Sequence, residues 1–132
     1  MKIIADTNVL VRAAVRDDAA QAQAAEKILQ QATLIAISLP CLCEFVWVLR
    51  RVYGLSSSSI ALAIRALLAT GNAVMNRPAV EAGLAFLEAG GDFADGIVAY
   101  EGHWLGGETF VSFEKKAVSL ASAQGLQAQL IS

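Results

Sequence analysis

The sequence predicts an α/β domain, a three-layer α/β/α sandwich around a short parallel sheet. Short apolar runs alternate with longer stretches of helical composition, and this alternation is typical of strands joined by crossover helices. Aromatic residues make up only 7 % of the chain, whereas 25 residues are alanine, which favours closely packed helices over a β-sandwich. The length of 132 residues fits one domain, and we expect it to span residues 1–132.

The first half of the chain predicts two strands and four helices. Residues 2–5 are apolar and run into Asp6-Thr7-Asn8, which fits a buried strand that ends at a helix start. Residues 9–15 form a short helix, and Asp17-Asp18 provides an N-cap for a second helix over 19–31. A strand follows at 33–38. Pro40 then suits the first turn of a helix over 41–53, and the serines at 56–59 cap another that reaches residue 69.

The second half continues the alternation. Residues 73–75 form a short strand, Arg77-Pro78 starts a helix that continues through Glu88, and Gly90-Gly91 ends it. Asp92 opens a helix that runs to about residue 104. Residues 109–112 (TFVS) are aromatic and β-branched, which favours a strand. A helix over 113–124 stops at Gly125, and a last strand covers 127–131.

Composition and charge exclude several classes of protein. The chain is 56 % hydrophobic with a net charge of −2, so it is neither disordered nor a protein that holds nucleic acid mainly through a basic face. No uncharged run reaches the roughly 18 residues of a membrane span, and the N-terminal apolar stretch is too short for a signal peptide. We therefore expect a cytoplasmic protein without membrane contact. Two cysteines and one histidine cannot make a structural zinc site.

Four carboxylates stand beside apolar sequence where the predicted strands end and helices begin: Asp6, Glu44, Asp95 and Glu114. The carboxyl ends of strands in an open α/β sheet face the crevice that binds ligands, so these acids can converge. Unpaired charges that meet in a crevice cost several kcal/mol unless a positive group holds them. Divalent cations with oxygen ligands, Mg²⁺ or Mn²⁺, suit an all-carboxylate set.

Each acid also has a structural interpretation. Asp92 and Asp95 have the spacing of an N-cap and its third helical residue, and we assign Asp92 to the cap and Asp95 to the ligands. Glu44 fits an exposed position on a half-buried helix, although its neighbours leave little polar face. Glu114 fits a charged helix start that the macrodipole favours. Asp6 is the hardest to explain as structural, because it ends a buried strand.

Four segments resemble PIN-domain proteins, specifically the VapC-type toxins of bacterial toxin–antitoxin pairs. They occur in the order and spacing of the family and cover essentially the whole chain. The segments are IIADTNVLVR at 3–12, LPCLCEFVWVL at 39–49, DFADGIVA at 92–99 and TFVSFEKKA at 109–117. The resemblance implies an α/β/α fold around a parallel sheet and a Mg²⁺- or Mn²⁺-dependent endoribonuclease that hydrolyses RNA with metal-activated water.

By motif position, Asp6, Glu44 and Asp95 are similar to the three core acids of the family. Glu114 stands where a fourth acid is usually Asp, and its extra methylene puts the second metal in doubt more than the activity. Thr7 or Asn8, and Ser112, would orient the carboxylates by hydrogen bonds. The resemblance also implies a homodimer and an antitoxin that covers the active-site groove. An alternative is a catalytically weak PIN-fold module that binds RNA or protein, although such a module would be expected to lose a core acid.

A third function, a phosphatase or receiver domain, lacks the DxD pair after the first strand, since position 8 is Asn8. Trp47 is interpreted as core rather than as a base-stacking platform, and His103 as a cap or a partly buried residue. The basic groups best placed to contact an RNA backbone, though also consistent with ordinary surface charges, are Arg12, Arg16, Arg50, Arg51, Lys115 and Lys116.

Overall fold

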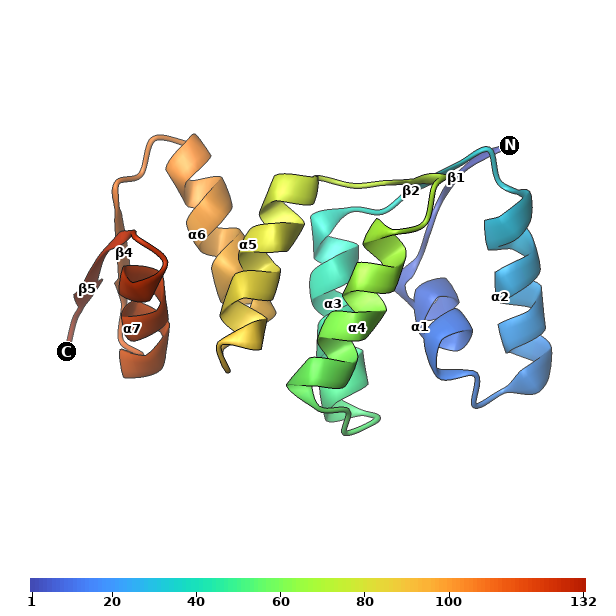
Figure 1. Ribbon diagram of the computed structural model, residues 1–132, viewed down its shortest axis with the longest axis horizontal. Coiled ribbons are helices and arrows are strands. Elements are labelled where there is room, and N and C mark those ends of the chain that lie inside the picture. Colours follow the sequence, from blue (N-terminus) through green and yellow to red (C-terminus); the bar gives the residue numbers. More distant parts are fainter. The chain divides into compact units, whose positions relative to one another are not determined.

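The computed structural model describes all residues 1–132, and they form two compact units, Met1–Asn76 and Arg77–Ser132. Both contain short parallel sheets with helices packed on them, so the predicted α/β class with parallel strands is confirmed (Figure 1). None of the seven helices combines the length and the apolar composition that a membrane span needs.

The first unit is a three-stranded parallel sheet with four helices. The strands are β1 (Lys2–Ile4), β2 (Leu34–Ala36) and β3 (Ala73–Val74), in the order β1-β2-β3. Ile3 pairs with Ile35, and Ile35 in turn with Ala73. The helices are α1 (Thr7–Val15), α2 (Ala19–Gln31), α3 (Leu39–Arg51) and α4 (Ser57–Leu68).

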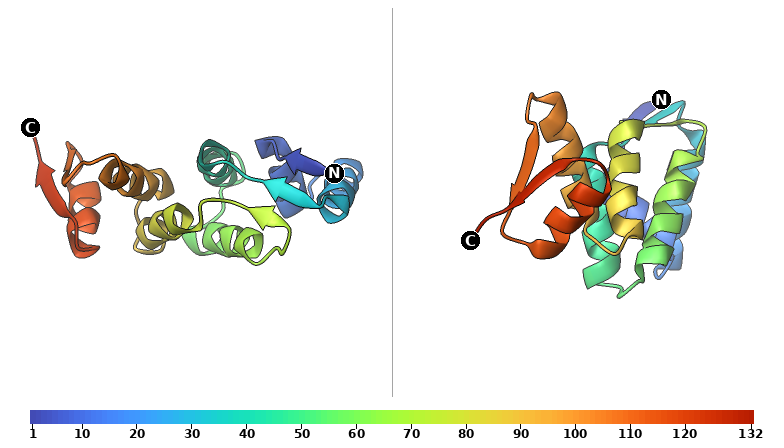
Figure 2. Two further views of the ribbon diagram at one scale, coloured as in Figure 1. Left: turned by 90° about the horizontal axis from the view of Figure 1, so that it is seen from above. Right: turned by 60° about the vertical axis from the view of Figure 1, so that its left-hand side comes forward.

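The second unit contains α5 (Arg77–Glu88), α6 (Phe93–Trp104), β4 (Thr109–Ser112), α7 (Lys115–Ala123) and β5 (Gln127–Leu130). β4 and β5 pair in parallel, with Ser112 opposite Leu130. α7 connects them and packs on both strands, as the two views of Figure 2 show. α5 and α6 form the other closely packed pair of this unit.

Side-chain caps fix the starts of α2, α3, α4 and α6, although α3 begins at Leu39, two residues before the predicted start. Asp18 accepts a hydrogen bond from the backbone N–H of Gln21, at 3.0 Å. Ser38 and Ser56 cap α3 and α4 in the same way. Each cap satisfies one backbone donor that the first helical turn leaves free. The starts of α1 and α7 have no such side-chain bond, and these two exceptions involve predicted site residues.

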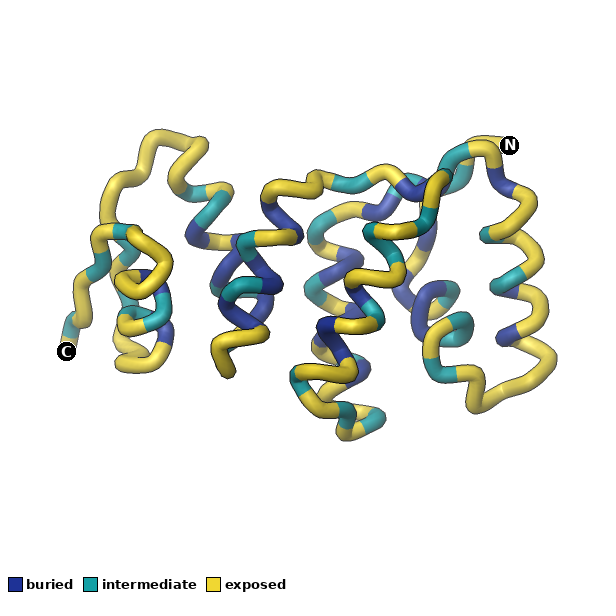
Figure 3. The backbone as a smooth tube through the Cα atoms, viewed as in Figure 1, coloured by how far each residue is buried: buried dark blue, intermediate teal, exposed yellow.

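The core lies on one stripe of each helix (Figure 3). In α3, Phe45 and Leu49 are almost completely buried, while the opposite side is open. In the second unit Phe86, Ala99 and Ala121 form a buried cluster against which the sheet residues Phe110 and Ala128 pack.

The first strand is less buried than predicted. Ile4 is 87 % exposed and Ile3 is partly exposed. Burial alternates along β1 from exposed to intermediate to exposed, which is the pattern of a strand with one open face.

Candidate active site

Two predicted site residues occupy N-cap positions without acting as caps. Asp6 precedes α1 just after β1, and Glu114 precedes α7 just after β4. An acid at this position normally accepts a bond from the second or third N–H of its helix, as Asp18 does. Neither Asp6 nor Glu114 makes that bond, so both exposed carboxylates remain available to a ligand.

In the first unit, Asp6 and Glu44 both act on one buried thiol. Cys41 lies in the first turn of α3, where its Sγ donates to the carbonyl oxygen of Ala5 at 3.5 Å. Burial raises the pKa of this thiol, a hydrogen bond from Thr7 lowers it, and the negative charges of Asp6 and Glu44 raise it further. These two carboxylates, one after β1 and one on α3, therefore both lie within electrostatic range of Cys41.

In the second unit, two other acids act electrostatically on Asp95 in the first turn of α6. The carboxylate of Asp92 accepts a hydrogen bond from the N–H of Ala94 at 3.1 Å, which confirms its assignment as the N-cap. Asp95 is partly buried in the same turn. Burial raises its pKa, and the negative charges of Asp92 and Glu114 raise it further. Burial and two like charges destabilise the ionised form of this carboxyl group, so a bound cation would stabilise it.

The structure thus gathers the predicted acids into two sets, Asp6 with Glu44 and Asp95 with Glu114. Within each unit, no three His, Cys, Asp or Glu side chains are placed to hold a metal ion. The donors themselves are all carboxylate oxygens, the ligand type that Mg²⁺ and Mn²⁺ prefer. The residues present therefore fit such an ion by donor chemistry.

A comparison with protein families identifies the chain. The PIN domain family model matches residues 3–100, about three quarters of the sequence. The chain belongs to the PIN-domain family. PIN domains are commonly nucleases, act on nucleic acid and generally use divalent metal ions. No curated protein matches the sequence.

The match to the PIN domain includes Asp6, Glu44 and Asp95, whereas Glu114 lies beyond its end. Glu114 is also the position that departs from the acid usual in VapC-type proteins. Two observations support Glu114 as a site residue. Its negative charge raises the pKa of Asp95, and it lies in the segment TFVSFEKKA that resembles the VapC-type proteins.

The predicted supporting residues of this PIN domain have separate local contacts. Thr7 is buried, and its hydroxyl donates to Cys41 Sγ at 3.7 Å. Ser112 Oγ accepts a hydrogen bond from the N–H of Glu114 at 3.0 Å and so fixes the turn that presents the glutamate. Asn8 is exposed in the first turn of α1.

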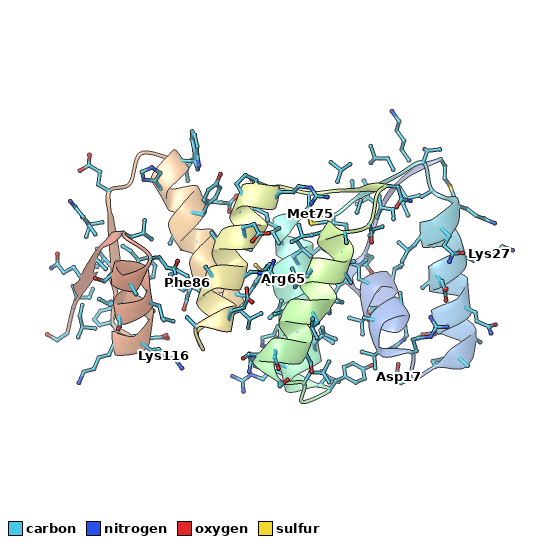
Figure 4. All side chains as sticks on the ribbon, in the orientation of Figure 1. Asp17, Lys27, Arg65, Met75, Phe86 and Lys116 are labelled. Atoms are coloured by element: carbon cyan, nitrogen blue, oxygen red, sulfur yellow. The ribbon has the colours of Figure 1, made fainter.

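Three of the six basic groups are held by other side chains. Arg12 bonds to Asp17 and to the hydroxyl of Tyr53, at 3.5 and 2.9 Å. Arg16 pairs with Glu26 at 2.8 Å, and Arg50 donates to Ser57 at 2.7 Å. Arg51, Lys115 and Lys116 are exposed, and the last two directly follow Glu114 (Figure 4 labels Asp17 and Lys116).

Sequence reasoning missed how closely α5 and α6 approach one another beside Asp95. Gly96 is buried, and a Cβ there would overlap the carbonyl oxygen of Ala82 and lie 2.8 Å from the Cα of Gly83. Gly83 in turn faces the ring of Phe93, which a Cβ would meet at 2.7 Å. The signal available in the sequence was a glycine inside each helical pattern, which often marks close packing.

Two further interpretations change. Trp47 was expected in the core, but its side chain is 59 % exposed, because it lies opposite Phe45 and Leu49 on α3. His103 is exposed in the last turn of α6, where its ring contacts Trp104 edge-on, with ring centroids 6.4 Å apart.

Proposed function

We propose that the protein is a metal-dependent endoribonuclease of the VapC type, the toxin of a toxin–antitoxin pair. The observation that carries the proposal is that Asp6 and Glu114 stand at N-cap positions without capping. The charge of Asp6 acts on Cys41 together with that of Glu44, and the charge of Glu114 acts on Asp95. A structural role would use these carboxylates for the helix start. A nuclease centre needs them free.

The proposal requires the two acidic sets to act together in one domain. The match to one PIN domain supports this, because it includes Asp6, Glu44 and Asp95. Asp6, Glu44, Asp95 and Glu114 would hold Mg²⁺ or Mn²⁺. Such an ion lowers the pKa of a water molecule and stabilises charge on a phosphodiester.

Local hydrogen bonds hold the backbone beside two of the proposed ligands. The bond from the Glu114 N–H to Ser112 fixes the turn after β4, and the cap by Asp92 fixes the start of α6 beside Asp95. Lys115 and Lys116 are exposed directly after Glu114 and would bind the phosphate backbone. Without the cation the carboxylates would repel that backbone, so substrate binding depends on the ion.

The four VapC-like segments carry the remaining parts of the proposal. These parts are RNA as the substrate, the toxin role, the homodimer, the cytoplasmic location and an antitoxin that covers the active site. A small reading frame for a DNA-binding antitoxin directly upstream would support the toxin role. Light scattering of the purified chain tests the dimer. A mass equal to one chain at all concentrations would contradict it.

The decisive experiment for the activity is RNA cleavage by the purified protein with Mg²⁺ or Mn²⁺ and with EDTA, alongside Asp6→Asn. Loss of a group that merely orients a ligand costs 10- to 100-fold, so we expect loss of a ligand to cost about 100-fold or more. Glu101→Gln is the matched control, since Glu101 is an exposed acid on α6 outside both sets.

Equal cleavage by Asp6→Asn and wild type would contradict the assignment of Asp6. A folded wild type that binds RNA but cuts no RNA class would favour the alternative, a catalytically weak PIN-fold module. This second function is favoured by Glu114, which stands where VapC-type proteins usually have Asp.

A further inference from the structure

One face of α3 carries an acid, an aromatic and a base in line. Glu44, Trp47 and Arg51 are spaced three and four residues apart, so they follow one another along the same side of the helix. All three are exposed, and Trp47 is 59 % exposed. The opposite side of α3 holds the buried residues Cys41, Leu42, Phe45, Val46 and Leu49.

This placement puts an indole close to a proposed metal ligand. With a rise of about 1.5 Å per residue, Trp47 lies about 4.5 Å beyond Glu44 along the helix axis. A nucleotide whose phosphate is bound beside Glu44 would therefore bring a base within reach of the indole. Arg51 continues the same face by one more turn and is a natural contact for the next phosphate.

Other roles explain Trp47 less well. Scattered exposed apolar side chains are normal at protein surfaces, but tryptophan is usually well buried. Trp47 is flanked on its own face by charged residues rather than by an apolar patch. An aromatic between charged groups is the pattern of single-stranded nucleic acid sites, where a base stacks on the ring and cations follow the backbone.

We propose that Trp47 is a base-stacking platform for single-stranded RNA next to the carboxylates and that Arg51 binds the adjoining phosphate. This inference rests on the proposed ribonuclease function and adds to it a contact for one base and for the phosphate beside it. Bases in a duplex are already stacked on each other, so only single-stranded or looped RNA can offer a free base face. Stacking tolerates any base, so Trp47 provides affinity and position rather than sequence choice.

The test compares two labelled oligonucleotides of equal length, a single-stranded RNA and a fully abasic ribose-phosphate chain. Binding is measured by fluorescence anisotropy with Ca²⁺ in place of Mg²⁺, and a denaturing gel checks that the RNA stays intact. The proteins are wild type, Trp47→Ala, Trp47→Phe and Trp104→Ala. Trp104 is the matched control because it is the only other tryptophan and is also exposed, at 73 %.

We expect Trp47→Ala to weaken binding of the RNA about 5- to 150-fold, the effect of losing one stacked base, and to leave binding of the abasic chain unchanged. Trp47→Phe should keep most of the preference for the RNA, and Trp104→Ala all of it. In a Trp104→Phe background, RNA should quench the emission of Trp47, and the abasic chain should not.

Three results would overturn the inference. Trp47→Ala could still prefer the RNA as strongly as wild type does. It could lose affinity for the RNA and for the abasic chain equally. It could also change its sedimentation coefficient, and that result would assign Trp47 to an interface between copies of the protein. If wild type cleaves RNA in an Asp6-dependent way while Trp47→Ala behaves like wild type, only the stacking role fails. If wild type neither cleaves nor binds RNA, the ribonuclease function fails as well.

Discussion

Replacing two glycines of the same helix should change stability in opposite directions. Gly96 and Gly102 both lie within α6. A Cβ at residue 102 meets nothing within 4 Å, whereas the three atoms nearest a Cβ at residue 96 are all backbone atoms of α5, with Gly83 Cα at 2.8 Å. Backbone cannot rotate away as a side chain can. Since ordinary contacts begin at 3.4 Å, α5 must withdraw by about 0.6 Å or more.

The magnitudes follow from two competing effects. Alanine in a helix interior is better than glycine by about 0.5–1 kcal/mol, so Gly102→Ala should raise the free energy of unfolding by that amount. Gly96→Ala gains the same propensity but overpacks the α5–α6 contact, which costs about 1–3 kcal/mol. We expect a net loss of about 1–2 kcal/mol, since the clash is with backbone.

Urea unfolding followed by far-UV circular dichroism measures both variants. Gly96→Ala should also weaken Mn²⁺ binding, because the neighbouring Asp95 moves with the helix, whereas Gly102→Ala should not. If Gly96→Ala is as stable as Gly102→Ala, the two helices do not approach one another as closely as described, and the account of how Asp95 is positioned is wrong.

Three other substitutions test the site and its surroundings. Asp95→Asn should stabilise the metal-free protein at neutral pH by less than about 1 kcal/mol, because it removes a charge that burial and like charges oppose. Because folding raises this carboxyl pKa, the cost in stability begins above the ordinary value of 3.8 and is complete above the raised value. The advantage of the Asn variant in urea unfolding should therefore disappear as the pH falls toward 3.8, and a constant advantage would contradict this. Ser38→Ala removes the cap of α3 and should lower the free energy of unfolding by about 0.5–2 kcal/mol. Asp6→Asn removes no cap and should leave the free energy of unfolding nearly unchanged in the same assay. Equal losses in the two variants would show that Asp6 caps α1. Tyr53→Phe should lower the midpoint of thermal unfolding, because it loses the bonds to Arg12 and Asp17 worth about 0.5–1.5 kcal/mol each, and it should leave RNA cleavage unchanged.

Local chemistry made most element boundaries predictable. α2 and β4 lie where the sequence placed them, because a capping Asp18 and a β-branched run bounded by polar residues are strong local signals. α1 begins two residues earlier than expected, since Thr7 is already helical after Asp6. α7 begins two residues later, at Lys115, because the Ser112 hydroxyl holds Glu114 in a turn.

The sequence predicted which residue types form the candidate site, but it predicted few of their contacts. Asp92 could be assigned to a cap from its spacing. Trp47 was misplaced because residue type was given more weight than its position opposite Phe45 and Leu49. The approach of Gly96 to the α5 backbone could not be inferred, since it depends on which faces of two helices meet. Similarly, pairing of Arg12 with Tyr53 joins residues 41 positions apart.

The proposed function requires Asp6 and Asp95 to bind the same divalent cation, and a double-mutant cycle of Mn²⁺ affinities tests this requirement. Wild type, Asp6→Asn, Asp95→Asn and the double variant are titrated with Mn²⁺, and free ion is measured by electron paramagnetic resonance. A shared centre predicts that either substitution alone weakens every bound ion and that the double variant loses much less than the sum of both effects. Independent, additive losses, with one ion lost per substitution and the other unaffected, would contradict it.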